Sequence, residues 1–192
     1  FTIDLPHGYI VTECGRYSLT EFRSRLRVAV RHPIVNLIYL SDCALILQAI
    51  HDLQSHSRAF LQFTMNDLMY SDMGVIKLKY LSYGKEITHY TAPEIIDGCN
   101  GDSQKSDVYS LGVIFWELLH PSKPFEITWN RNIAYVEFDD YPDALKDLIF
   151  KMLSRRVDSR PSVCDVTHDI NTIIYEYFGD ILSLIRTDLN QT

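Results

Sequence analysis

The chain has 192 residues, of which 46% are hydrophobic and 12% aromatic, so it has the length and composition of one globular domain and not of a disordered chain. A formal net charge of -7 at pH 7 argues against binding to nucleic acid through bulk charge. No stretch has the pattern of a signal peptide or a membrane span, so we expect no membrane contact.

The cysteines form no Cys-x-x-Cys pair, which argues against a structural zinc site and a dense disulfide framework. Free, scattered cysteines are typical of a reducing compartment, and we therefore expect a cytoplasmic protein. They stand far apart in the chain: Cys14, Cys43, Cys99 and Cys164.

The first 31 residues predict a short strand and then the start of a helix. Residues 9–15 are mostly β-branched or apolar up to a turn residue, which predicts a strand that ends in a linker. Ser18 or Thr20 is a candidate N-cap, and Glu21 stands three residues after Ser18, as a capping box requires. Beyond it lies a basic run that is typical of a solvated face, with a docking surface for an acidic partner as the alternative. Its members are Arg23, Arg25, Arg27 and Arg31.

The middle of the chain predicts a helix followed by a hairpin. Residues 41–55 have a helical pattern, with apolar residues on one face. These are Leu45, Ala49 and Leu53, joined by Leu47 and Ile50. Residues 72–74 supply the turn of a hairpin, and a strand follows up to Leu78.

Residues 91–94 predict a turn that enters a short helix, because Pro93 suits an early helical position and Glu94 suits the positive end of the helix. Residues 107–119 predict a helix that is apolar on nearly every face, including Trp116. About a dozen apolar residues fall short of the roughly 20 that span a bilayer. We therefore expect this helix to lie at the centre of a globular core.

The C-terminal third predicts further helices. Residues 143–153 carry an apolar stripe at helical spacing, which predicts an amphipathic helix packed on the core. Residues 163–184 predict two helical stretches with a break at Gly179. The first stretch carries the stripe Ile170, Ile173, Ile174, Tyr177 and Phe178.

Three of these segments resemble motifs of the protein kinase superfamily, in the family's order. Residues 92–94 match the Ala-Pro-Glu motif that closes the activation segment, and residues 107–112 match the start of the central C-lobe helix. Residues 158–162 match the late motif whose arginine pairs with that glutamate. The resemblance implies a pair between Glu94 and Arg160, and an Asp107 that holds the backbone of the catalytic loop.

The fold that the resemblance implies is mainly α: a kinase-like C-terminal lobe with a small β-hairpin. Residues 1–192 would form a single C-lobe, in which residues 1–15 correspond to the last N-lobe strand and the hinge and residues 16–192 to the helical lobe. No Gly-x-Gly-x-x-Gly sequence occurs in the chain, and we expect the N-lobe to be absent.

The catalytic loop of the family should carry an Asp that accepts the substrate proton and, further on, an Asn that holds a metal ion. Asn66 matches the family Asn. Counting back places Leu61, or Gln62 with a one-residue slip, at the Asp position. No Asp or Glu occurs between Asp52 and Asp67, so no alignment restores a base.

The magnesium-binding Asp of the family should follow the hairpin strand. One alignment places Tyr80, Leu81 and Ser82 at this motif, and another places Ser82, Tyr83 and Gly84 there. No Asp occurs from Met73 to Ile96. Glu86 is the alternative carboxylate, but its longer side chain would have to rebuild an octahedral magnesium site.

The resemblance therefore implies a pseudokinase, without catalytic residues or cofactor, that acts as a binding module. Chains of this kind are similar to viral kinase mimics, such as the baculoviral mimic of translation-initiation-factor kinases, which would act in the host cytoplasm. We expect a partner that is a protein kinase or another signalling protein, and also self-association, because exposed apolar surface favours it. The alternatives are a regulatory domain of a larger signalling protein and a kinase fragment with unconventional activity.

Overall fold

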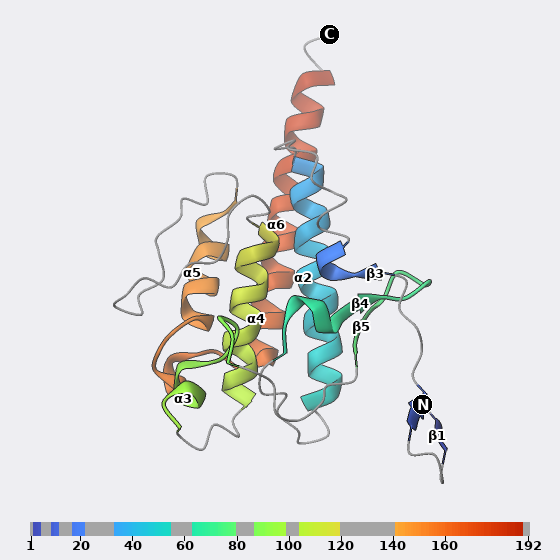
Figure 1. Cartoon of the computed structure of the whole chain (residues 1–192). Coiled ribbons are helices and arrows are strands. Elements are labelled where there is room, and N and C mark those ends of the chain that lie inside the picture. Colours follow the sequence, from blue (N-terminus) through green and yellow to red (C-terminus); the bar gives the residue numbers. More distant parts are fainter. Residues whose placement is uncertain are drawn as a thin grey trace.

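The computed structural model describes residues 2–4, 9–11, 17–21, 33–54, 63–79, 87–98, 104–119 and 141–189. It is mostly helical, with a small antiparallel sheet at one side (Figure 1). Helix α2 (Pro33–Gln54) packs against both α6 (Val163–Leu189) and α4 (Gln104–Leu119). Helix α5 (Asp143–Met152) packs against α4 and α6. Within these residues, no helix is both long and apolar enough to cross a membrane.

Helix α2 begins at Pro33, eight residues before the predicted start at residue 41. Ser41, which has the residue type of an N-cap, is an exposed residue inside the helix. Leu45 and Ala49, predicted to line the buried face, are only partly buried. The predicted members Leu47 and Ile50 are buried, and they belong to a full stripe at helical spacing that packs on the core: Tyr39, Leu40, Cys43, Ile46, Leu47 and Ile50.

The predicted hairpin is present. Strand β4 (Leu68–Tyr70) pairs antiparallel with β5 (Ile76–Leu78), and β3 (Tyr17–Ser18) pairs with the other edge of β4. Gly74 in the turn has a φ of 73°, which glycine adopts without the strain of a side chain. The sheet lies beside α2, so the hairpin is held against the helical body.

The N-terminal segment contains the predicted strand from residue 9 to residue 11, as β2 (Tyr9–Val11). Residues 12–16, where the linker was expected, lie outside the described residues. Strand β2 pairs with β1 (Thr2–Asp4), which the sequence pattern did not predict. The predicted capping box also forms: the backbone N–H of Ser18 donates to Glu21 Oε2 at 2.9 Å, and the N–H of Glu21 donates to Ser18 Oγ at 3.2 Å.

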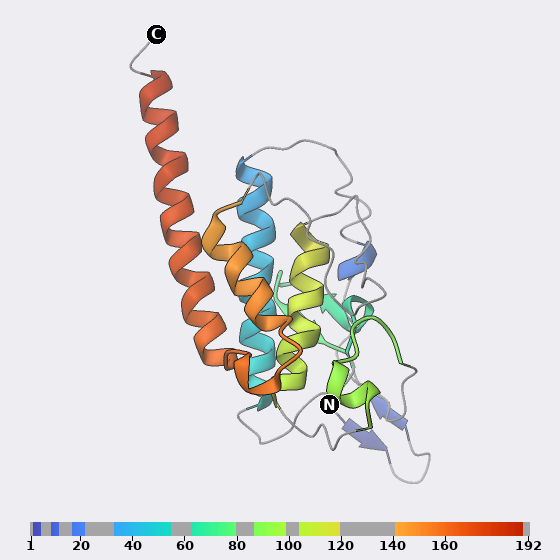
Figure 2. The same cartoon turned by 90° about the vertical axis from the view of Figure 1, so that its left-hand side faces the viewer.

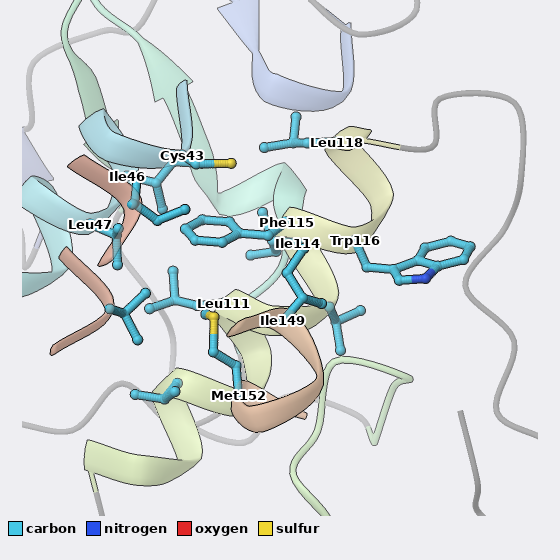
Figure 3. Close-up of a cluster of buried hydrophobic side chains, with 14 of the residues drawn as sticks. Cys43, Ile46, Leu47, Leu111, Ile114, Phe115, Trp116, Leu118, Ile149 and Met152 are labelled. Atoms are coloured by element: carbon cyan, nitrogen blue, oxygen red, sulfur yellow. The ribbon is translucent and has the colours of Figure 1, made fainter. Parts of the chain in front are cut away.

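Helix α4 is the centre of the core, as predicted, and every residue from Ser106 to Leu119 is buried. It begins at Gln104, three residues before the predicted start. In Figure 3, Phe115 of α4 faces Cys43 and Ile46 of α2, while Trp116 points away from this cluster. Trp116 is nevertheless only 1% exposed.

Helix α5 confirms the predicted amphipathic stripe, because each of its apolar members is buried. They are Leu145, Leu148, Ile149 and Met152, followed by Leu153 just beyond the helix. Gly112 allows α5 to come close to α4: a Cβ atom at Gly112 would lie 3.0 Å from atoms of Leu153 and Met152. The absence of a side chain at this position sets the spacing of the two helices.

Helix α6 is one continuous helix of 27 residues, so the predicted break at Gly179 is wrong. Ile173 and Ile181 are buried on either side of Gly179, and Asn36 of α2 donates to the Tyr177 hydroxyl at 3.2 Å. Packing along α2 thus outweighs the low helix propensity of a single glycine. Figure 2 shows α6 at the outer edge of the molecule, with its C-terminal turns extending beyond the other helices.

Candidate functional site

The candidate site is the region that joins α3 (Pro93–Ile96) to α4 and to the turn before α6. Proline occupies the first turn of α3, as predicted. The guanidinium of Arg160 donates from Nη1 to Glu94 Oε1 and from Nη2 to Glu94 Oε2, each at 2.7 Å. The structure therefore contains the bidentate pair that the motif match implied.

Further hydrogen bonds hold this pair in place. Arg160 is 1% exposed, and it also donates from Nε to the Ser154 carbonyl at 2.7 Å and from Nη1 to the Lys105 carbonyl at 3.0 Å. Ser106 Oγ donates to Glu94 Oε1 at 2.6 Å. Burial opposes ionisation of Glu94, but the hydrogen bonds from Arg160 and Ser106 outweigh it, so the pKa of Glu94 lies below its ordinary value. The pair is thus charged and hydrogen-bonded at neutral pH.

A second polar cluster surrounds the carboxylate of Glu117 on α4. The Tyr90 hydroxyl donates to Glu117 Oε2 at 2.5 Å, and His89 Nε2 lies 3.1 Å from Glu117 Oε1. Ser110 Oγ donates to the Tyr90 carbonyl at 2.9 Å. These contacts attach the segment before α3 to α4. Sequence reasoning missed this cluster, although an acidic residue inside an otherwise apolar helix is a signal for a buried polar partner.

Asp107 is fully buried in the first turn of α4. Its Oδ2 accepts a hydrogen bond from Gln54 Nε2 at 3.1 Å, and Gln104 Nε2 donates to the Gln54 carbonyl at 3.3 Å. These contacts join the end of α2 to the start of α4. Residues 55–62, whose backbone Asp107 was expected to hold, lie outside the described residues, so that role stays a prediction.

Asn66 is exposed in the short 3-10 helix η1 (Met65–Asp67). The neighbouring carboxylate of Asp67 completes a capping box: its Oδ2 accepts from the Thr64 backbone N–H at 2.8 Å and from Thr64 Oγ1 at 2.9 Å. Asp67 is therefore engaged in holding the local backbone, immediately before β4.

Several residues singled out in the sequence lie outside the described residues, so their placement stays untested. They are the degenerate motif positions Leu61, Gln62, Tyr80, Leu81, Ser82, Tyr83 and Gly84, and the basic run Arg23, Arg25, Arg27 and Arg31. Among the residues that the structure does describe, no group of three His, Cys, Asp or Glu side chains is arranged to hold a metal ion.

A small pocket lies where α2, α4 and α6 meet, with a volume of about 190 Å³. Its lining residues are His51, Gln54, Gln104, Ser162, Val163 and Cys164. Small-ligand sites are commonly about 300–1,000 Å³ and mainly apolar. This pocket is smaller than such sites, and we assign no ligand to it.

Comparison with known proteins agrees with this geometry. The family model described as the protein kinase domain matches residues 66–170, which is more than half of the chain. The match begins at Asn66 and includes Glu94, Asp107 and Arg160. The chain belongs to the protein kinase domain family.

Curated relatives are kinases or kinase-like proteins. The actin-regulating kinase PRK1 of Saccharomyces cerevisiae is 33% identical over 91 residues, which are 44% of this chain and 11% of that protein. The inactive protein tyrosine kinase pTKL of Plasmodium berghei is 30% identical over 103 residues, 50% of this chain and 8% of that protein. The human testis-specific serine/threonine-protein kinase 3 is 26% identical over 180 residues, 86% of this chain and 65% of that protein. The chain spans less than two thirds of the length of each of these relatives.

Proposed function

We propose that this protein is a catalytically inactive kinase-like module that binds a protein kinase, or another signalling protein, and regulates it. The observation that carries the proposal is a contrast between two sets of positions. The positions that hold the scaffold together keep their charged residues, in the pair between Glu94 and Arg160. The positions aligned with the two catalytic aspartates carry Leu61 or Gln62, and Tyr80 or Ser82.

The chemistry of phosphoryl transfer explains why this contrast matters. One Asp accepts the proton of the attacking hydroxyl, and another holds the magnesium ions that neutralise charge on the phosphates. Leucine, glutamine, tyrosine and serine side chains do neither at neutral pH. Both positions lie within residues 52–96, so the argument does not depend on what precedes Phe1.

Two carboxylates in the part of the chain that the structure describes are engaged in internal contacts. Asp67, next to Asn66, is bound to Thr64 through its capping box. Glu117 is bound by Tyr90 and His89. Each is engaged in an internal contact, so neither is a ready substitute for a catalytic Asp. One of the relatives is also named as an inactive kinase.

A protein with the scaffold of a kinase and no transfer chemistry is suited to bind what a kinase binds. We infer that it presents a surface like that of a kinase lobe to a true kinase and inhibits or otherwise regulates it, as a viral kinase mimic would. The basic run that includes Arg23 and Arg27 is the candidate contact with an acidic partner surface.

A binding titration against a panel of purified protein kinase domains tests this function. We expect saturable binding to at least one kinase and a change in the rate at which that kinase phosphorylates a peptide. Replacing Arg23, Arg25, Arg27 and Arg31 by serine should weaken the binding, whereas replacing the exposed Arg155 and Arg156 by serine should not. If no kinase in the panel binds or changes rate, the proposed function is wrong.

A further inference from the structure

The outward face of α6 carries an apolar stripe that none of the described helices covers. Tyr175 is 81% exposed, Phe178 46% and Leu182 39%. Together with Gly179 they stand at positions i, i+3, i+4 and i+7, so they form one line along the helix. The opposite side of α6 is occupied, because Ile173 and Tyr177 pack on the core. Figure 2 shows this helix at the edge of the molecule.

Nothing in the described part of a single copy explains Gly179. It lies inside a helix, where glycine costs about 1 kcal/mol relative to alanine. A Cβ atom at this position would meet nothing within 4 Å, so no neighbouring helix requires the missing side chain. Its φ is not positive, so the backbone does not require glycine either. The missing side chain leaves a gap, which we call the notch, between the larger apolar side chains of the stripe. Such a gap allows a side chain of a second helix to pack closely against the backbone.

The order of residues along the stripe makes it complementary to itself. Phe178 and Gly179 are adjacent, and Tyr175 and Leu182 stand at equal distances on either side of their midpoint. A two-fold axis through that midpoint, between two antiparallel helices, would place the ring of Phe178 over Gly179 of the second copy. The same axis would place Tyr175 beside Leu182 of the second copy, and each contact would occur twice, as in any isologous interface.

We propose that two copies of this chain pair through the outer face of α6, antiparallel, with Phe178 of each copy seated on Gly179 of the other. The residues around the stripe fit this arrangement. Asp180 is three or four residues from no member of the stripe, so its charge lies on a side of the helix turned away from the contact. Exposed polar residues continue the same face toward its N-terminal end and form a rim: His168, Asn171 and Thr172.

The size of the stripe sets the strength of the pairing. Stable interfaces bury about 800 Å² on each partner, which is more than three side chains supply. The dimer is therefore weak and depends on protein concentration. This inference does not rest on the proposed kinase-binding function, and either can fail without the other.

Sedimentation equilibrium of the chain over a range of concentrations tests the pairing. We expect the average mass to rise with concentration from 22.3 kDa toward twice that value. Phe178→Asp should keep the mass of one chain throughout, because it places a charge in the centre of the stripe. Asp180→Lys, a charge change on the same helix away from the stripe, should leave the association intact. A mass of one chain up to about 1 mM wild-type protein would overturn the proposal, and so would a Phe178→Asp variant that associates like the wild type.

Gly179→Leu tests the notch separately from folding. In a single copy the new side chain projects into open space and helix propensity improves, so the thermal midpoint of the dilute protein should not fall. The dissociation constant of the dimer should rise about tenfold or more, because the notch is filled. An unchanged or tighter association would exclude the contact between Phe178 and Gly179.

Cross-linking tests the register. A variant with both Tyr175→Cys and Leu182→Cys, oxidised under mild conditions, should form disulfides that join position 175 of one copy to position 182 of the other. Peptide mass spectrometry distinguishes this result from links between identical positions. Links from 175 to 175 and from 182 to 182 would mean parallel helices and would overturn the antiparallel arrangement.

Discussion

Arg160 is a buried cation whose donors are directed to Glu94 and to backbone carbonyls. Removing the guanidinium would leave the Glu94 carboxylate half-buried with no cation beside it. We therefore expect Arg160→Met to lower the free energy of unfolding by roughly 3–5 kcal/mol, measured by urea denaturation.

The matched control is Arg155→Ala. Arg155 makes a 3.6 Å ion pair with Asp97, but its side chain is 59% exposed, and exposed pairs contribute about 0–1 kcal/mol. Equal losses in the two variants would contradict the view that the Arg160 pair holds the site together.

Asp42 on α2 is a second buried charge, and it is not paired with a cation in the described part of the chain. Burial raises the pKa of its carboxyl from 3.8 to about 6, while a hydrogen bond from Tyr70 on β4 opposes the rise. Because the folded state binds this proton more tightly than the unfolded state, the protein is most stable where the group is protonated. Its stability falls as the pH rises from about 4 to about 6.

Asp42→Asn removes this titration. A shift of about two pKa units corresponds to roughly 3 kcal/mol of stability that the wild type loses when Asp42 ionises. The buried N–H groups of the new amide offset part of the gain from avoiding this loss. We expect the variant to be more stable than the wild type by about 2 kcal/mol at pH 7–8, with the gain shrinking below pH 6 and lost by about pH 4. Urea denaturation across this pH range measures it, and a gain that does not change with pH would contradict the assignment.

At the scale of the elements, α4 and α5 followed from the sequence because their own residues determine their burial. Helix α4 is apolar on nearly every face, so it must lie inside the core. Helix α5 has one apolar stripe, so that stripe must face the core. The start of α2 and the continuity of α6 did not follow, because packing between the two helices decides them. A serine inside α2 and a glycine inside α6 look like ends when each helix is considered alone.

Replacing a helical glycine by alanine should have opposite effects on stability at Gly112 and at Gly179. Gly112→Ala should destabilise the protein by about 1–3 kcal/mol, because the new Cβ would lie 3.0 Å from Leu153 and Met152 in the contact between α4 and α5. Gly179→Ala should stabilise it by roughly 0.5–1 kcal/mol at low concentration, because its Cβ meets nothing and helix propensity improves. Thermal unfolding of both variants in dilute solution checks this. A Gly112→Ala variant as stable as the wild type would show that Gly112 does not set the spacing of α4 and α5, and a less stable Gly179→Ala variant would contradict the open position of Gly179.

At the scale of the whole molecule, the sequence predicted only those contacts of the site whose residues belong to family motifs. The contact between Glu94 and Arg160 joins residues 66 positions apart, and only the family motif connects them in the sequence. The cluster around Glu117 has no such motif, and its partners come together because the segment before α3 folds back on α4. The basic run and the positions aligned with the catalytic aspartates lie outside the described residues, so their roles stay predictions from the sequence.

The central claim is that this member of the kinase family keeps the scaffold and lacks phosphoryl transfer. A thermal-shift titration with ATP, with and without magnesium or manganese, tests it most directly when combined with a transfer assay on a generic protein substrate. An active protein kinase in the same assay serves as the control, since a ligand at 100 times its dissociation constant stabilises the native state by about 2.7 kcal/mol. We predict no metal-dependent shift and no transferred phosphate. A shift that requires the metal, together with phosphate on the substrate, would contradict the account.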